Sequence, residues 1–174
     1  MVLPLVALVI YFVMLLVPRI DPGRANYASF APAYNTVRML VLLVLAAVQV
    51  FSVLEARGRV MNMDMIVPLF VGIILVVVGN VLGKLRPNWF VGIRTPWTLS
   101  SKESWLRTHR AGGWVFIVSG VLMMIVGLFR SQWYLGVLRG CLSAGVLGLI
   151  VYSYVVWKND PEKTPPAGTT PAAS

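Results

Sequence analysis

The sequence predicts an all-α protein that is embedded in a membrane as a helical bundle with about five transmembrane helices. Hydrophobic residues make up 58% of the 174 residues and charged residues only 12%, so the polar side chains are too few to cover a water-soluble globule. Five apolar runs each approach the length of about 20 residues that crosses a hydrocarbon core. The single cysteine, Cys141, excludes an intramolecular disulfide and a cysteine-based metal cluster.

The five predicted spans are bounded by residues that start or end helices. The first span has no positive residue before it and no cleavage site after it, so we interpret it as a retained helix and not as a signal peptide. Pro18 and Pro22 close it. Gly58 follows the second span, and Pro68 falls in the opening turn of the third. In order, the predicted spans are Leu3–Val17, Val37–Leu54, Ile66–Leu82, Gly113–Phe129 and Tyr134–Trp157.

The sequence after the last span differs in composition from the rest. Residues 1–157 form one predicted transmembrane domain, whereas residues 158–174, KNDPEKTPPAGTTPAAS, are polar and rich in Pro, Ala and Thr. Such a segment cannot bury enough apolar area to fold. We therefore expect it to be a disordered tail.

Positive charge is distributed unequally between the two sides of the predicted bundle. Eleven of the fifteen Lys and Arg residues fall on the side that carries the C-terminus, and four fall on the other. Because cytoplasmic loops carry an excess of Lys and Arg, we predict an outside N-terminus and a cytoplasmic C-terminus in a bacterial cell membrane. The net charge of +9 is then explained by contact with membrane lipids, and no nucleic acid partner is expected.

A polar segment between the third and fourth spans interrupts the apolar pattern. Six of the eleven basic residues lie between Gly79 and Gly113, so a functional role for this segment would weaken the inference about orientation. Ser100 and Glu103 form a predicted capping box, which starts a helix that runs without proline into the fourth span. A generic loop needs only charge, yet this one is also dense in Asn, Gly, Pro and Trp. We predict a structured interfacial motif.

Within this motif, Gly92 and Pro96 bracket a predicted tight turn, and Thr95 before the proline should be extended. The turn would aim Arg94 at a ligand. The predicted ligand-binding residues are anion donors, hydrogen-bonding groups and aromatic walls at the interface: Asn80, Lys84, Arg86, Asn88, Arg94, Thr95, Trp97, Trp105, Thr108, His109 and Arg110. No metal, cofactor or catalytic residue is predicted, because His109 has no Cys or carboxylate companion.

Each class of these residues also has a simpler interpretation. The tryptophans are what an aromatic belt supplies at a membrane surface, and the basic residues are what a lipid-facing collar supplies. A lone histidine is more often a hydrogen-bonded interfacial residue than a ligand. The high density of Asn, Gly, Pro and Trp in the motif, in addition to its charge, favours a ligand-binding site.

The segment GNVLGKLRPNWFVGIRTPWTLSSKESWLRTHRAGG, residues 79–113, resembles the signature of the SdpI family of bacterial multipass membrane proteins. That signature reads approximately G-N-x-x-G-K-x-x-P-N-x-x-x-G-I-R-T-P-W-T-L-S-S and is followed by a W-x-x-T-H-R helix start. The earlier stretch PRIDPGRANYASFAPAY, residues 18–34, also looks like the corresponding region of the family. Longer members carry an additional N-terminal segment with its own hydrophobic helix.

The resemblance implies an immunity protein that confers resistance to a membrane-active toxin peptide. It also implies a signalling role in which a cytoplasmic repressor is held at the membrane. Homo-oligomers are compatible with the many glycines of the spans. These functions are expectations from the family and do not follow from composition or spacing.

Two other classes of function remain open at this stage. In an intramembrane enzyme acting on a lipid or lipid-linked anionic substrate, His109 would be the base and Arg94 would stabilise charge. Against this, Glu103 is the only acid in the motif and no Ser-His-Asp set is evident. A transporter is the third alternative, but few ionisable residues fall within the spans. A non-enzymatic protein is therefore the leading hypothesis.

The orientation is tested by replacing Ser100 with cysteine and treating intact cells with a membrane-impermeant thiol reagent. We expect labelling only after permeabilisation, because the charge distribution places Ser100 in the cytoplasm. The unsubstituted chain, which carries only Cys141, supplies the background. Ready labelling of Ser100→Cys in intact cells would place the motif outside.

Overall fold

The computed structural model describes residues 2–129 and 133–164. This part of the chain is all-α and contains five helices that are long and apolar enough to cross a membrane. The prediction of an all-α bundle with about five spans is therefore confirmed. The long helices are α1 (Val2–Ile20), α2 (Tyr27–Ala56), α3 (Met63–Leu82), α5 (Lys102–Leu128) and α6 (Tyr134–Lys158). Two short elements lie between them, the 3₁₀ turn η1 (Arg24–Asn26) and the helix α4 (Pro96–Leu99).

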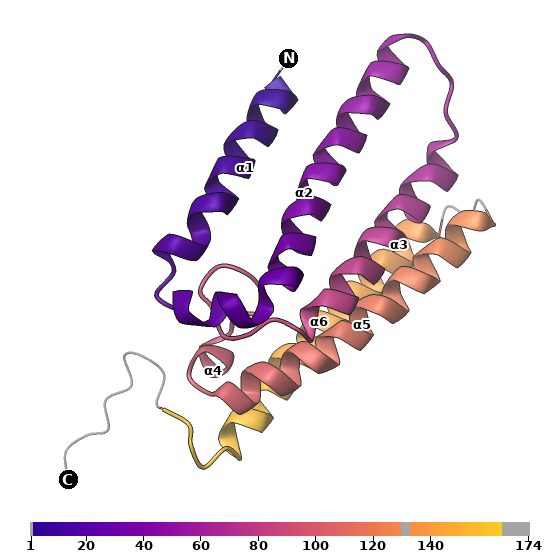
Figure 1. Cartoon of the computed structure of the whole chain (residues 1–174). Helices are drawn as coiled ribbons and strands as arrows, with labels where there is room; N and C mark the ends of the chain where they lie inside the picture. Colours follow the sequence, from indigo (N-terminus) through magenta and orange to yellow (C-terminus); the bar gives the residue numbers. More distant parts are fainter. Residues whose placement is uncertain (1, 130–132, 165–174) are drawn as a thin grey trace.

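The long helices divide into two groups (Figure 1). Helices α3, α5 and α6 lie together on one side, and α5 has extensive contacts with both α3 and α6. Helices α1 and α2 stand beside this group, and α1 has its main contacts with α2 and η1. The two groups meet at the end where η1, α4 and the loop between α3 and α5 gather. This end carries the polar sequence.

Glycines allow α3 and α5 to approach closely. Gly72 and Gly79 on α3, and Gly113 and Gly120 on α5, are each spaced by seven residues, so each pair lies on one helix face. A Cβ atom on Gly79 would lie 2.6 Å from the carbonyl oxygen of Gly113, and one on Gly120 would lie 2.6 Å from that of Gly72. Small residues at such spacing are a common means of helix association in membranes.

The glycines of α6 differ in how closely a neighbouring helix approaches them. A Cβ on Gly145 would lie 2.5 Å from the Val115 side chain on α5. In contrast, Gly140 and Gly148 have no heavy atom within 4 Å of such a Cβ. The face of α6 that carries them is therefore open in this chain.

The predicted start of the fourth long helix was wrong by one residue. Ser101, and not Ser100, is the N-cap, and its side chain accepts a hydrogen bond from the backbone N–H of Ser104. Ser100 instead ends α4, and Glu103 forms an ion pair with Arg107 at 2.5 Å and does not close a capping box. The long helix that projects beyond the apolar span is confirmed, since α5 begins well before Gly113.

Two prolines lie deeper inside their helices than predicted, since Pro18 was expected to close the first helix and Pro68 to lie in the opening turn of the third. Helix α1 continues past Pro18 because the backbone N–H of Asp21 bonds to the carbonyl of Val17 at 3.0 Å. Pro68 is the sixth residue of α3, beyond the opening turn. Its ring is close to α5, since a Cβ on Gly127 would lie 2.8 Å from Pro68 Cγ. Neighbouring helices make such prolines tolerable in membrane spans.

The chain beyond α6 returns towards the start of α5. The backbone N–H and the hydroxyl of Thr164 both donate to the carbonyl of Ser100, each at 3.0 Å. This part of the expected tail is therefore ordered by hydrogen bonds. Residues 165–174 lie outside the described residues.

The α3–α5 contact is tested by a pair of glycine-to-alanine changes. Gly79→Ala should lower the stability by about 1–3 kcal/mol, because its methyl group would overlap the Gly113 carbonyl and force the helices apart. Gly140→Ala adds the same methyl group in open space, and we expect little change. Thermal unfolding in detergent measures both variants, and equal melting temperatures would contradict the proposed importance of the contact.

Candidate functional site

The loop from Gly83 to Ser101, here called the connecting segment, begins where α3 ends and reaches the cap of α5. Its first residue, Gly83, lies beside Arg110 of α5, since a Cβ on Gly83 would be 3.7 Å from Arg110 Cα. Most of its buried polar groups have partners in the structure, as groups removed from water require.

A buried carboxylate joins the connecting segment to the α1–α2 turn. Asp21 is only 1% exposed. Its oxygens accept hydrogen bonds from the Tyr27 hydroxyl at 2.7 Å, from the backbone N–H of Gly23 at 2.6 Å and from that of Trp89 at 3.1 Å. Among the described residues, no ion pair involves Asp21. Neutral donors therefore compensate its burial, and any change that removes the carboxylate leaves Trp89 without its partner.

A second contact brings the same two backbones together. The Asn26 side chain donates to the Pro87 carbonyl at 2.8 Å. A Cβ on Gly23 would lie 3.2 Å from that carbonyl and 3.3 Å from the Cα of Asn88. Glycine at position 23 permits this close approach. The aromatic residues of early α2 then pack with Leu85 and Trp105 into one hydrophobic core, in which the buried aromatic members are Tyr27, Phe30, Tyr34 and Trp105.

The Asn88 side chain organises the turn in the middle of the connecting segment. Its carbonyl oxygen accepts from the backbone N–H groups of Phe90 at 3.0 Å and Val91 at 2.7 Å. Its amide donates to the carbonyls of Arg86 at 2.9 Å and Val91 at 3.0 Å. These bonds use both ends of the amide, which is nearly inaccessible to solvent. Asn88 is therefore a structural support for the residues around it.

His109 supports the next part of the segment from α5. Its Nε2 accepts a hydrogen bond from the backbone N–H of Ile93 at 2.9 Å, and its Nδ1 donates to the carbonyl of Trp105 at 2.8 Å. The imidazole is therefore the neutral tautomer protonated on Nδ1, since an imidazolium could not accept from Ile93. The ring is fully buried and stacks on Trp105, with 4.0 Å between the centroids.

Gly92 is required beside His109 for two reasons. Its φ angle of +122° lies in the region that favours glycine. A Cβ at this position would also lie 2.3 Å from His109 Nε2. The predicted turn at Gly92 is therefore confirmed, and its cause is the close approach of the backbone to the imidazole.

Reciprocal threonine hydrogen bonds close the end of the segment. Thr95 is extended, as predicted, and caps α4 by accepting from the backbone N–H of Thr98 at 3.2 Å. The Thr98 hydroxyl in turn accepts from the Thr95 N–H at 2.9 Å. The Thr95 hydroxyl lies 3.2 Å from that of Ser153 on α6, and Ser104 donates to the Ser153 carbonyl at 2.8 Å. These contacts attach the segment to α6 as well as α5.

Asp160, just beyond α6, also contacts the cap of α5. Ser101 donates its hydroxyl to the Asp160 carboxylate, and the backbone N–H of Glu162 donates to the same carboxylate at 2.9 Å. The Ser101 hydrogen bond, with a smaller effect from Glu162, lowers the pKa of the Asp160 carboxyl. The carboxylate therefore stays ionised near neutral pH.

The structure separates the predicted site residues into a buried and an outer set. The buried members are Asn88, Trp105, Thr108 and His109. The outer members are Asn80, Lys84, Arg86, Arg94, Thr95, Trp97 and Arg110, of which Thr95 and Trp97 are half-buried. Trp105 is thus a core residue and not an interfacial wall, whereas Trp97 packs edge-on against Tyr154 of α6 with 5.3 Å between the ring centroids.

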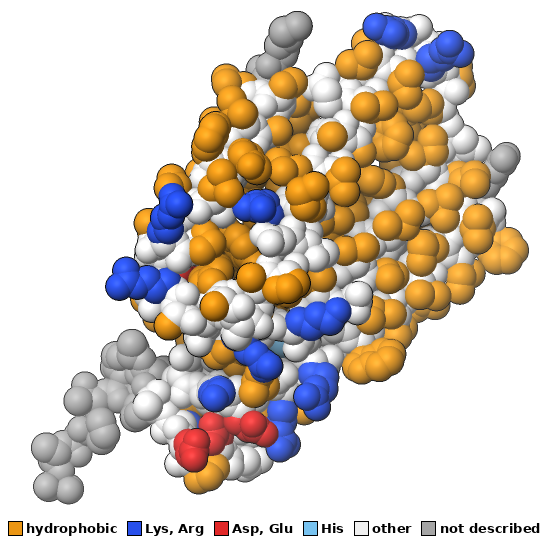
Figure 2. Space-filling view, in the orientation of Figure 1, with side chains coloured by type: hydrophobic (Ala, Val, Ile, Leu, Met, Phe, Trp, Pro, Cys, Tyr) orange, Lys and Arg blue, Asp and Glu red, His pale blue; other side chains and the backbone are white. Residues whose placement is uncertain are grey.

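The outer basic residues do not converge on one pocket. Arg86 lines a hollow of about 750 Å³ with Lys102, and Arg110 lines another of about 510 Å³ on α5. Lys84 lines a third, of about 350 Å³, between α2 and α3. Arg94 instead donates to the Trp89 carbonyl within the segment. Figure 2 shows Lys and Arg side chains distributed around this end of the molecule, while hydrophobic side chains cover the helices.

Several residues of this arrangement escaped the sequence analysis. Asp21 carried a signal, because an acidic residue directly after an apolar span is unusual and calls for a partner. Ser153 and Thr98 gave no such signal in the sequence, because a lone hydroxyl in a helix usually bonds to its own backbone. No three His, Cys, Asp or Glu side chains of the described residues gather closely enough to hold a metal ion.

The support from His109 is tested by Gly92→Ala. The variant should expose Arg94 to trypsin at least about tenfold faster, because strain of about 1–3 kcal/mol at this backbone and the overlap with His109 open the segment. Gly83→Ala is the matched control, since its Cβ would meet only Arg110 Cα at 3.7 Å. Rapid cleavage of the unsubstituted protein at Arg94 would mean that the segment is a loose loop.

Comparison with known proteins identifies the region that contains this site. Residues 84–156 match the family model described as the SdpI/YfhL protein family. The chain is also 30% identical over 128 residues to the immunity protein SdpI of Bacillus subtilis (strain 168), an alignment that covers 74% of this chain and 60% of that relative. The chain thus spans about 60% of the length of the relative it matches. No solved structure matches it. The matched region holds most of the connecting segment together with α5 and nearly all of α6, and these two matches confirm the resemblance to the SdpI family.

Proposed function

We propose that this protein confers immunity to a membrane-active toxin peptide and that the connecting segment is the part that meets the toxin. The similarity to a relative named as an immunity protein supports the class of function. The role of the segment is supported by the way in which its interior and outward side chains are arranged. Its interior polar groups bond to its own backbone and to α5, whereas its outward side chains are basic and aromatic.

The exposed surface of the segment suits an amphipathic peptide. Trp89 is 53% exposed and Phe90 is 43% exposed, and both lie near Arg94 in the chain. Arg94 uses one Nη to hold the Trp89 carbonyl. Its guanidinium has five N–H donors in a planar fork, so donors remain for a carboxylate. A membrane-active peptide offers both an apolar surface and at least one carboxylate, at its C-terminus.

The buried residues of the predicted site act in this proposal as supports. Asn88 shapes the turn that precedes Arg94, and His109 holds the backbone of Ile93, the residue directly before Arg94. A site whose side chains are held by such contacts binds at a lower entropic cost than a loose loop. We therefore expect binding residues and supporting residues to differ in how they respond to substitution.

The same contacts favour a non-enzymatic role. Both ring nitrogens of His109 are engaged by backbone groups, so the imidazole has no free site at which to take up a substrate proton. Glu103 forms an ion pair with Arg107. We accordingly do not propose either group as a base.

We propose further that the segment faces the cytoplasm and that it takes part in signalling by holding a repressor at the membrane. The argument is the excess of basic residues on this side of the bundle. The labelling of Ser100→Cys tests this part separately, because a segment that faces outside cannot contact a cytoplasmic repressor.

Immunity is tested in Bacillus subtilis cells that lack their own immunity protein SdpI and grow in mixed culture with the intact strain. Cells that produce the present protein should survive, and cells that carry an empty vector should not. Membrane levels of the protein are measured in parallel by immunoblot. Survival no better than that of the vector control, at normal membrane levels, would contradict the proposal.

In this assay Arg94→Lys should lose nearly as much survival as Arg94→Ala. The charge remains in the lysine variant, but one ammonium group cannot bond to the Trp89 carbonyl and also present a planar fork. Lys102→Ala is the control, because this exposed residue at the start of α5 has no hydrogen bond within the segment, and it should be silent. If losses follow total charge instead, and Arg94→Lys is harmless, the segment is only a basic collar.

A further inference from the structure

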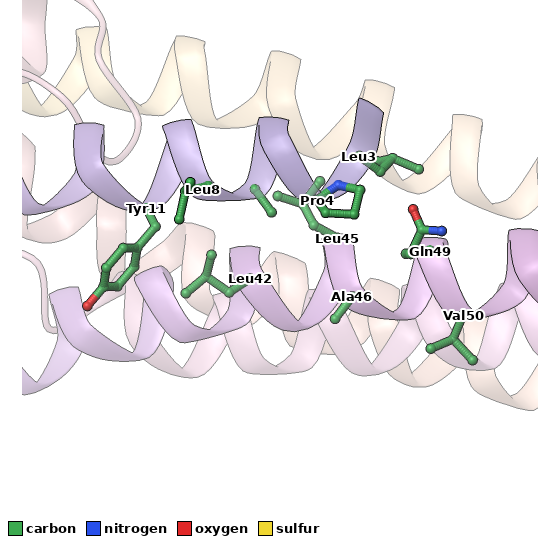
Figure 3. Close-up of a pocket in the computed structure, with 10 residues that line it drawn as sticks. Leu3, Pro4, Leu8, Tyr11, Leu42, Leu45, Ala46, Gln49 and Val50 are labelled. Atoms are coloured by element: carbon green, nitrogen blue, oxygen red, sulfur yellow. The ribbon is translucent and has the colours of Figure 1, made fainter. Parts of the chain in front are cut away.

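A groove lies between residues 3–11 of α1 and residues 42–50 of α2 (Figure 3). It has a volume of about 540 Å³ and its lining is almost wholly apolar, with Gln49 as the main polar side chain. Figure 3 shows Leu8 and Tyr11 of α1 and Leu42 of α2 facing the space between the two helices. The groove is open at its side, where the surrounding membrane would lie.

The groove exists because the two helices are fastened at one end only. The Tyr34 hydroxyl donates to the carbonyl of Met14 at 2.6 Å, which holds α2 against α1 near the connecting segment. Beyond this bond the groove is lined partly by small side chains, among them Ala7 and Ala46. Small residues permit close contact between helices in membranes, but here the helices remain apart. A further molecule can therefore fill the space between them.

A cationic side chain stands at the end of the groove nearest Tyr34. The guanidinium carbon of Arg38 lies 5.9 Å from the centroid of the Tyr11 ring, and Tyr11 lines the groove. The Arg38 Nε is buried and has no hydrogen-bond partner among the described residues. Among the described residues, the one ion pair joins Glu103 and Arg107 of α5, so Arg38 has no acidic partner there. A cation inside a membrane span without an acidic partner is costly, and it favours an anion as ligand.

We propose that the α1–α2 groove binds an acyl chain of an anionic phospholipid from the surrounding bilayer, with the lipid phosphate on the Arg38 guanidinium. Arg38 lies one turn from Leu42, so a phosphate on its guanidinium would adjoin the end of the groove. The kink of α2 at Phe30 is eight residues away, or about 12 Å along the helix. From that depth an arginine side chain reaches the headgroup zone by extending towards it.

The shape of the groove suits a lipid chain. Its lining residues span Leu3 to Tyr11 on α1 and Leu42 to Val50 on α2, about 12 Å along each helix, and almost all of them are apolar. Because the groove is open at its side, an acyl chain of the surrounding bilayer can lie along both helices without moving them.

The bound lipid would complete the packing of α1. This helix has its main contacts with α2 and η1, and most of its side chains are exposed. A chain in the groove adds apolar contact along both helices and leaves the connecting segment untouched. The proposal is independent of immunity, because none of its residues belongs to the proposed toxin site.

The test is native mass spectrometry of the purified protein in mild detergent, titrated with phosphatidylglycerol or phosphatidylcholine. The unsubstituted protein should retain one phospholipid and prefer phosphatidylglycerol. Arg38→Gln should weaken phosphatidylglycerol binding about tenfold or more, as the loss of a charge-assisted hydrogen bond implies, and abolish the preference. Ala46→Phe should block the groove and reduce the binding of both lipids.

Two matched variants control for charge and bulk. Arg57→Gln removes an exposed arginine at the far end of α2, and Leu43→Phe adds an aromatic ring to the exposed face of the same helix. Both should bind lipid as the unsubstituted protein does. Circular dichroism checks that each variant is folded, and Arg38→Gln decides alone if Ala46→Phe is not. Equal binding of the two lipids, unchanged binding by Arg38→Gln, or a dimer without bound lipid would each overturn the proposal.

Discussion

The close contact between α3 and α5 determines where the polar sequence between these helices can lie. Because Gly79 and Gly113 place two backbones against each other, the end of α3 lies beside Arg110, more than two turns into α5. The connecting segment must therefore run back along the first turns of α5 to reach its cap. A loop with this constraint has to turn sharply, and it does so at Gly92, where the backbone passes directly over His109.

This sharp turn buries backbone polar groups, which then need hydrogen-bond partners other than water. Side chains supply the missing partners: Asn88 within the segment, His109 from α5 and Asp21 from the α1–α2 turn. Asp21 thereby also fastens the α1–α2 pair to the other three helices. One carboxylate thus contributes both to the local turn and to the arrangement of the whole bundle.

Supporting and presenting roles are consequently divided between different residues. His109 and Trp105, which the sequence predicted to bind a ligand, are buried and support the backbone of the connecting segment. The residues left on the surface are Arg94 and the aromatic pair Trp89 and Phe90, together with basic side chains around separate hollows. This division is typical of a binding surface carried on a rigid support, and it differs from a catalytic pocket, where titratable groups converge.

The sequence by itself determined the all-α class, the five spans, the extended Thr95 and the turn at Gly92. Each of these features depends on local composition or backbone geometry. The fold class and the spans depend on runs of apolar residues long enough to cross a membrane, and the extended Thr95 depends on its place before a proline. The turn depends on the ability of glycine to adopt a positive φ. Only the tertiary structure decided that Ser101 and not Ser100 caps α5, because Ser100 is used to end α4. It also decided that His109 supports the backbone and that Arg38 has no acidic partner among the residues that the structure describes, because the groups that surround a side chain in a bundle come from helices far apart in sequence.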